Sequence, residues 1–222
     1  MRPVIEKYWK QLAPHHDANA FEVLQAGYGA PERGYHDWSH IAELLGNLDE
    51  MSALATRPAL IAAAIFWHDS VYMTRGADGV ARKDEENVGD SAKLFLRHSR
   101  FSANDTAAIH DLIMATAGHA SARAAQEYYP GFSRDLDLFL DLDLSPLGAP
   151  WDVFADNFNR IRHEFSWVPE DEFYQSRLRM LEVFRNCGDT LFRHAESRAR
   201  WLERTQDNLR RVETELLQPP VA

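Results

Sequence analysis

Two short motifs in the first third of the chain carry histidines in a context that suits metal binding. Residues 35–40 have the sequence Tyr-His-Asp-Trp-Ser-His, and residues 66–69 have the sequence Phe-Trp-His-Asp. The second motif closes an apolar run, where a histidine and a carboxylate are costly to bury unless something neutralises or coordinates them. Imidazole and carboxylate groups together suit Mn, Fe, Co, Ni or Zn. The two motifs therefore indicate a site for one divalent transition metal.

A third candidate ligand lies much further along the chain, within the leucine-rich stretch 135–144. Asp143 is flanked by leucines, and so is Asp141, two residues earlier. On a helix, side chains two residues apart point about 200° away from each other. The two carboxylates therefore cannot easily serve the same metal, and only one of them is expected to do so.

The order of these motifs resembles the HD superfamily of metal-dependent phosphohydrolases, and in particular its small bacterial branch of predicted HD phosphohydrolases. The resemblance is carried by Arg33–Ile41, Phe66–Tyr72 and Asp141–Gly148, and it continues through Ile161–Glu164 to Arg177. It covers most of the chain and implies an all-α, single-domain HD-type helical bundle. Because the Asp-Leu-Ser string is part of the resemblance, the implied metal ligands are His40, His68, Asp69 and Asp143.

The resemblance also implies a reaction: hydrolysis of a small phosphorylated metabolite, a nucleotide or a phosphomonoester, by attack of water. A divalent metal acts as a Lewis acid and lowers the pKa of its bound water, so Asp69 counts as catalytic as well as metal-binding. His36 resembles the histidine that protonates the leaving oxygen in the cyclic-nucleotide phosphodiesterase branch, although Asp37 stands where those enzymes have Asn. Glu86, after Glu85, is expected to orient or deprotonate water; a solvated helix N-terminus is the alternative for both glutamates.

Basic side chains are needed to bind the phosphate, and arginine suits bidentate contacts with oxyanions. An ordinary surface charge is the alternative for each of them, and Arg162 could instead pair with Glu164. A histidine between the second and third motifs could contact phosphate or hold a second metal, although a single metal is expected. The candidate substrate-binding residues are Arg33, Lys83, His119, Arg162 and Arg177.

Two other functions use the same ligand types. An HD-type iron-dependent oxygenase would need a di-iron centre and therefore more histidines near the site than this sequence offers. A non-catalytic, metal-containing HD module that binds a ligand would keep the four metal ligands without turnover. Metal content and oxygen consumption would separate these alternatives from a phosphohydrolase.

Apolar spacing predicts the helices that must position these side chains. No segment alternates as a strand would, and a polar loop with glycines at 74–83 is expected beside the site. One all-α domain is predicted for residues 1–217, with a frayed tail at 218–222. Helices are expected at about 3–13, 21–28, 38–51, 58–71, 135–144, 151–165, 170–185 and 193–217, with others beginning at 84 and near 102.

The bulk composition narrows the partners and the compartment. A net charge of −10 argues against a surface for nucleic-acid polymers, whose footprint is basic. Cys187 is the only cysteine, which suits a reducing cytosol. The N-terminus lacks an apolar signal core, and the apolar run 59–67 is shorter than the roughly 20 residues that span a bilayer. We therefore expect a cytoplasmic protein without a membrane partner; the sequence leaves a homo-oligomer open.

Overall fold

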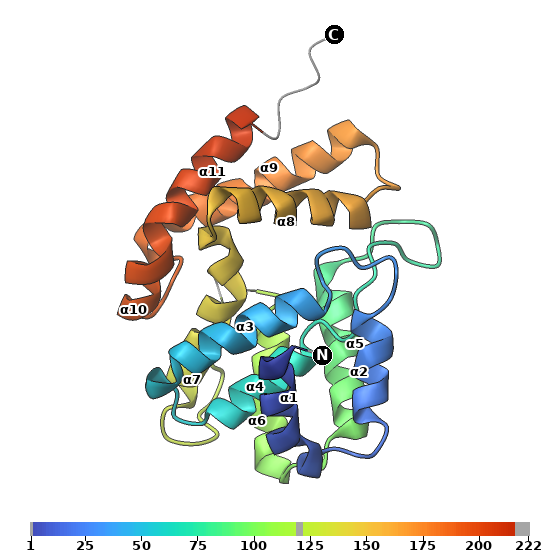
Figure 1. The fold of residues 1–222 in the computed structure, drawn as a ribbon, viewed down its shortest axis with the longest axis vertical. Helices are drawn as coiled ribbons and strands as arrows, with labels where there is room; N and C mark the ends of the chain where they lie inside the picture. The colour runs from blue at the N-terminus through green and yellow to red at the C-terminus, as the bar shows by residue number, and fades with distance from the viewer. Residues whose placement is uncertain (1, 119–121, 216–222) are drawn as a thin grey trace.

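The computed structural model describes residues 2–118 and 122–215, and in these ranges the chain is helical without a β-sheet (Figure 1). Two isolated β-bridges, His16–Ser99 and Arg75–Ala81, only tie loops together. The prediction of an all-α, single-domain bundle is confirmed. The helices are α1 (Pro3–Leu12), α2 (Ala20–Tyr28), α3 (Trp38–Glu50), α4 (Pro58–Trp67), α5 (Asp84–His98), α6 (Ala103–Ala115), α7 (Phe132–Leu144), α8 (Trp151–Glu164), α9 (Glu170–Cys187), α10 (Ala195–Ser197) and α11 (Glu203–Glu215).

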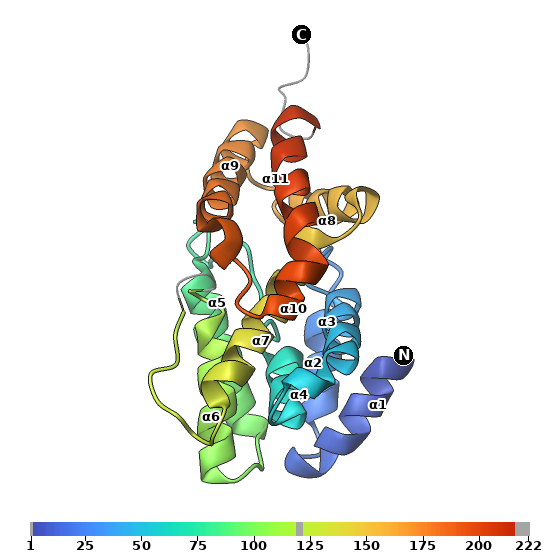
Figure 2. The same ribbon diagram turned by 90° about the vertical axis from the view of Figure 1, so that its left-hand side faces the viewer.

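Helix α4 is the centre of the larger group of helices. Every residue from Leu60 to Trp67 is buried, as expected for a helix that is apolar on all sides. It packs against α1, α3, α5, α6 and α7, which surround it in both views (Figures 1 and 2). The helix ends at Trp67, four residues before the predicted end at 71, and the turn that follows carries His68 and Asp69.

A second group, formed by α8, α9 and α11, lies over one end of this bundle (Figure 2). Its own apolar core contains Phe154, Phe158, Phe173, Leu181, Leu209 and Val212. A short 3₁₀ turn, Ser145–Gly148, leads from α7 of the first group to α8 of the second. The side chains that meet in the candidate site come from both groups.

The C-terminal helix expected over 193–217 is interrupted. The chain forms α10, then a π-helical turn at Arg198–Leu202, and only then α11. Here Trp201 lies against Gly148, where an added Cβ would come within 2.7 Å of the Trp201 side chain. The π-helical turn is therefore the part of the chain in which Trp201 packs against the connection between α7 and α8. The predicted tail at 218–222 lies outside the described residues.

Other helix boundaries follow local capping. Ser102 accepts a hydrogen bond from the backbone N–H of Asp105 at 3.1 Å, which confirms the predicted start of α6. Helix α7 begins at Phe132, three residues before the predicted start, after Gly131 in a left-handed conformation (φ 94°). None of the described helices combines the length and apolar character needed to cross a membrane.

Candidate metal centre

Two histidines and two aspartates from three separate segments meet at one point. His40 lies in the first turn of α3, His68 and Asp69 follow α4, and Asp143 lies near the end of α7. Nε2 of His68 is 3.1 Å from Oδ2 of Asp69 and 3.3 Å from Oδ1 of Asp143. Nε2 of His40 is 3.7 Å and 3.5 Å from the same two oxygens. The four residues implied as ligands are thus brought together.

The ring of His68 presents its nitrogen atoms in a form that suits a cation. Nδ1 of His68 lies 2.9 Å from the carbonyl oxygen of Ile65, so Nδ1 carries the proton and donates it. Such a bond leaves the Nε2 lone pair available to a metal. Nε2 of His68 is buried and faces the two carboxylates, but it makes no hydrogen bond, which is costly without a ligand. His40, His68 and Asp69 offer ligand atoms within 4.8 Å of one another and could hold a metal ion.

The charges in this cluster depend strongly on one another. Burial by itself lowers the pKa of His68, but the adjacent carboxylates of Asp69 and Asp143 raise it well above its usual value. Burial by itself raises the pKa of Asp69, but the neighbouring His68 lowers it below its usual value. The arrangement therefore stabilises negative charge on the carboxylates and positive charge between them.

Asp141 has a different role from Asp143, as the helical argument requires. Its carboxylate is fully buried and accepts hydrogen bonds from the backbone N–H groups of Arg193 and His194, both at 2.8 Å. These bonds hold the segment that precedes α10. The structure therefore brings Asp143, and not Asp141, to the histidines.

His36 is held by a buried carboxylate. Its Nδ1 lies 2.7 Å from Oε2 of Glu164, near the end of α8, and its ring stacks on Tyr72 with the centroids 3.7 Å apart. The other carboxylate oxygen of Glu164 accepts from the backbone N–H groups of Tyr35 and His36 at 2.7 and 2.9 Å. Burial raises the pKa of Glu164, but the hydrogen bond with His36 outweighs it and lowers that pKa.

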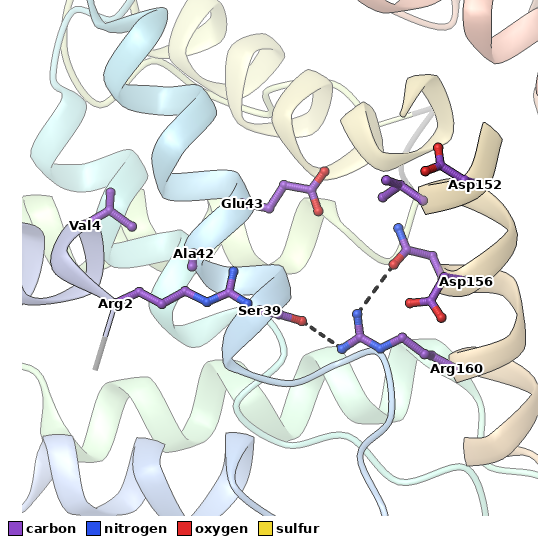
Figure 3. Close-up of a pocket in the computed structure, with 10 residues that line it drawn as sticks. Arg2, Val4, Ser39, Ala42, Glu43, Asp152, Asp156 and Arg160 are labelled. Carbon is purple, nitrogen blue, oxygen red and sulfur yellow. Dashed lines mark hydrogen bonds between the residues drawn. The ribbon is translucent and has the colours of Figure 1, made fainter. Parts of the chain in front are cut away.

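Arg160, one turn before Glu164 on α8, fixes the same segment from the other side. It donates to the carbonyl oxygen of Gly34 at 2.7 Å and to Oδ2 of Asp37 at 3.0 Å. It also donates to Oγ of Ser39 at 2.7 Å, the bond drawn in Figure 3. Asp37 is the N-cap of α3, so α3 begins after His36 rather than at it. The rings of His36 and His40 nevertheless lie 6.2 Å apart.

These side chains border a cavity of about 180 Å³. Besides His36 and the four candidate ligands, its wall contains polar groups from α5 and from the residue that follows α6, and apolar groups from α8 and α9. The further lining residues are Tyr35, Tyr72, Asp84, Asn87, Val88, Thr116, Ile161, Arg177, Met180 and Phe184.

Arg177 is the basic residue that the structure places in this wall. Its guanidinium donates to the sulfur of Met180 at 3.2 Å and lies over the rings of Phe165 and Phe173 at 5.6 and 5.4 Å. Burial lowers the pKa of Arg177. Among the described residues, no carboxylate forms an ion pair with it. A positive charge with this environment is well suited to receive an anion.

The other basic candidates have structural partners instead. Arg33 donates to the carbonyl oxygens of His36, Asp69 and Ser70 at 3.1, 2.7 and 3.0 Å and so ties the two histidine motifs together. Arg162 donates to the carbonyl oxygens of Phe165 and Val168 and does not pair with Glu164. The structure therefore does not bring Arg33 or Arg162 into the cavity wall.

The first turn of α5 also differs from the sequence prediction. Oε2 of Glu86 accepts from the backbone N–H of Lys83 at 3.1 Å and caps the helix. Lys83 and Glu86 line a separate surface hollow beside the 74–83 loop. Asp84 is the acid of this turn that reaches the cavity. The alternative of a helix N-terminus therefore describes Glu86. No sequence pattern singled out Asp84. His119 lies outside the described residues.

Comparisons with protein-family models, curated proteins and solved structures found no match for this chain.

Proposed function

We propose that this protein is a metal-dependent phosphohydrolase of the HD type, with one divalent transition metal held by His40, His68, Asp69 and Asp143. The observation that carries the proposal is the convergence of two imidazole nitrogens and two carboxylates from three distant segments, with each nitrogen 3.1–3.7 Å from an oxygen of both carboxylates. A buried His68 nitrogen that faces two carboxylates without forming a hydrogen bond fits a metal ligand. Four protein ligands leave positions for water and substrate on the ion.

An anionic substrate is supported by one basic residue of the cavity wall, Arg177. Arg177 supplies a guanidinium without an ion-pair partner among the described residues, and it borders the same cavity as the proposed ligands. A phosphate group bound in this cavity would compensate the positive charge of Arg177. When bound, the metal would neutralise charge on the phosphoryl oxygens and make a water molecule nucleophilic near neutral pH.

The chain itself supplies the proton transfers. Glu164 accepts from Nδ1 of His36, so the other ring nitrogen is the one available to the cavity. The hydrogen bond to Glu164 orients the ring, so that Nε2 can give a proton to the leaving oxygen. A histidine suits this task because its pKa lies near the working pH. Asp84, rather than Glu86, is placed to hydrogen-bond a water in the cavity.

The ligand count favours hydrolysis over di-iron chemistry. Among the described residues, one group of histidines and acids could hold a metal, and it contains His40, His68 and Asp69. Asp143 adds a fourth ligand to this group. Among the described residues, no second group of histidines and acids that could hold a metal lies beside it. A mononuclear site of this kind supports the phosphohydrolase proposal.

A turnover screen tests the proposal. The purified protein, loaded in turn with Mn²⁺, Mg²⁺, Co²⁺ and Ni²⁺, is assayed against phosphomonoesters, nucleotides and nitrophenyl phosphate. We expect metal-dependent release of phosphate that is abolished in His68→Ala and kept in His110→Ala, a histidine of α6 outside the cavity wall. Equal turnover by His68→Ala and the wild type would show that the activity does not belong to this site.

A further inference from the structure

A smaller cavity of about 120 Å³ adjoins the proposed metal centre. It lies between the end of α7, helix α8 and helix α9. Six residues line both cavities: Tyr35, Asp143, Ile161, Arg177, Met180 and Phe184. The two spaces are therefore adjacent, with Asp143 and Arg177 at their common border.

The walls of this smaller cavity beyond the shared border are mostly apolar. They are formed by Leu144, Pro146, Leu147, Phe154, Phe158 and Leu181. Asn157 also contributes, but its amide oxygen accepts from Arg160 at 3.5 Å, which turns that oxygen toward the guanidinium. Nδ2 of Asn157 is buried without a hydrogen-bond partner and can donate one hydrogen bond to a ligand. A sugar or glycerol, with its several hydroxyl groups, would still lose most of its hydrogen bonds to water in this space. We call it the apolar chamber.

We propose that the apolar chamber holds the alcohol portion of the substrate, so that the enzyme acts on phosphomonoesters of short apolar alcohols. The inference rests on the proposed phosphohydrolase function. The phosphate would lie at the border, against Arg177 and the metal, and the esterified group would extend past Asp143 into the chamber. This arrangement pairs the anionic end of the substrate with the charged cavity and its apolar end with the apolar walls.

The size of the chamber limits the alcohol. A cavity of about 150 Å³ accommodates benzene, so 120 Å³ suits an apolar group of about five carbon atoms. A nucleoside is too large to fit inside it. The chamber thus favours a short-chain phosphomonoester over the nucleotide that the sequence left open.

A wider hollow on another side of the metal cavity offers a competing place for an alkyl chain. It has a volume of about 690 Å³ and includes Val168 and Phe165 along with the shared Tyr72, Asp84, Arg177 and Met180. This hollow is broad and also lined by charged side chains of α9. We therefore expect substrate to pass through it on the way to the metal cavity. A test of the chamber must separate binding in these two spaces.

Binding of an alkylphosphonate series makes this separation without requiring turnover. Methyl- to heptylphosphonate are titrated calorimetrically against the protein, with and without Mn²⁺. Each methylene buried in the chamber should strengthen binding about fourfold, and the gain should stop near five carbons. Leu147→Phe, which fills the chamber, should remove most of the gain. Val168→Phe, a matched aliphatic-to-aromatic change in the wider hollow, should leave it unchanged.

Phe154→Leu provides a second variant, because it enlarges the chamber and should move the end of the gain to a longer chain. Thermal melts of all variants establish that they are folded. Two results would overturn the proposal for the chamber even if the protein hydrolyses phosphate esters. One is equal affinity for all the phosphonates, and the other is a gain in affinity with chain length that Val168→Phe removes and Leu147→Phe does not. Conversely, a chain-length gain that Leu147→Phe abolishes would support the chamber even if no phosphatase activity is found.

Discussion

Glu164 and His36 form a buried carboxylate–histidine pair, with Oε2 of Glu164 2.7 Å from Nδ1 of His36. The residues come from α8 and from the segment before α3, so this contact connects the two helix groups beside the candidate metal centre. It orients the ring and selects which nitrogen faces the cavity. The side chain of Glu164 is only 2% exposed, so its charge acts on the imidazole with little screening by water.

His36→Ala should separate proton transfer from metal binding. We expect turnover to fall by about 10²–10⁴-fold, the range for a lost acid–base group, with metal content unchanged. The loss should be smaller for nitrophenyl phosphate, whose leaving group needs little protonation. Steady-state kinetics on both ester types check this, and equal losses would indicate a positioning role instead.

Glu164→Gln should weaken the same step through His36. The amide can still hydrogen-bond Nδ1 of His36 but lacks the negative charge of the carboxylate, so we expect a reduction in kcat of about tenfold or more and a displaced pH–rate profile. Metal content measured alongside is the control, because Glu164 is not a proposed ligand. An unchanged pH profile would mean that Glu164 only holds the backbone of Tyr35 and His36.

His68→Ala and Asp69→Ala should each remove the metal. We expect close to one transition metal per chain in the wild type, measured by elemental analysis. Since bound ligands must be deprotonated, metal occupancy should fall as pH drops through the histidine range. Full metal content in both variants would end the proposal of a metal centre at this point.

The two aspartates of α7 should respond in opposite ways. Asp143→Asn should lose metal and keep its thermal stability, because an amide is a poorer, uncharged ligand. Asp141→Asn should keep metal but destabilise the protein by about 1–3 kcal/mol, because it weakens two buried hydrogen bonds to Arg193 and His194. Metal analysis and chemical unfolding of both variants at one pH test the pair, and the reverse pattern would reassign the ligand.

The ion pair between Arg57 and Asp105 predicts a pH dependence far from the site. Hydrogen bonding to Arg57 lowers the pKa of Asp105 below its usual value. A lowered carboxyl pKa contributes stability at neutral pH that is lost as pH falls through the folded-state pKa. We expect Asp105→Asn to be less stable than the wild type by about 0.5–1 kcal/mol at pH 7. In urea unfolding curves the difference should narrow as the pH falls below the usual range of a carboxyl pKa.

Several features followed from the sequence alone. The apolar spacing predicted an all-α fold and located most helices, because one buried face per helix imposes a period of 3.6 residues. The opposition of Asp141 and Asp143 also follows from helix geometry, and the structure has them facing different partners. Local rules of this kind depend only on neighbours in the chain, and a sequence contains those completely.

The tertiary structure decided which charged residues surround the cavity. The sequence does not distinguish the three candidate arginines. In the structure Arg33 and Arg162 donate to backbone carbonyl oxygens, whereas Arg177 borders the cavity. The same applies to Glu86, which caps its helix, and Asp84, which reaches the site. The apolar chamber exists only where α7, α8 and α9 meet. Such assignments depend on how helices distant in sequence pack, because a side chain's partner is set by what lies opposite it in space.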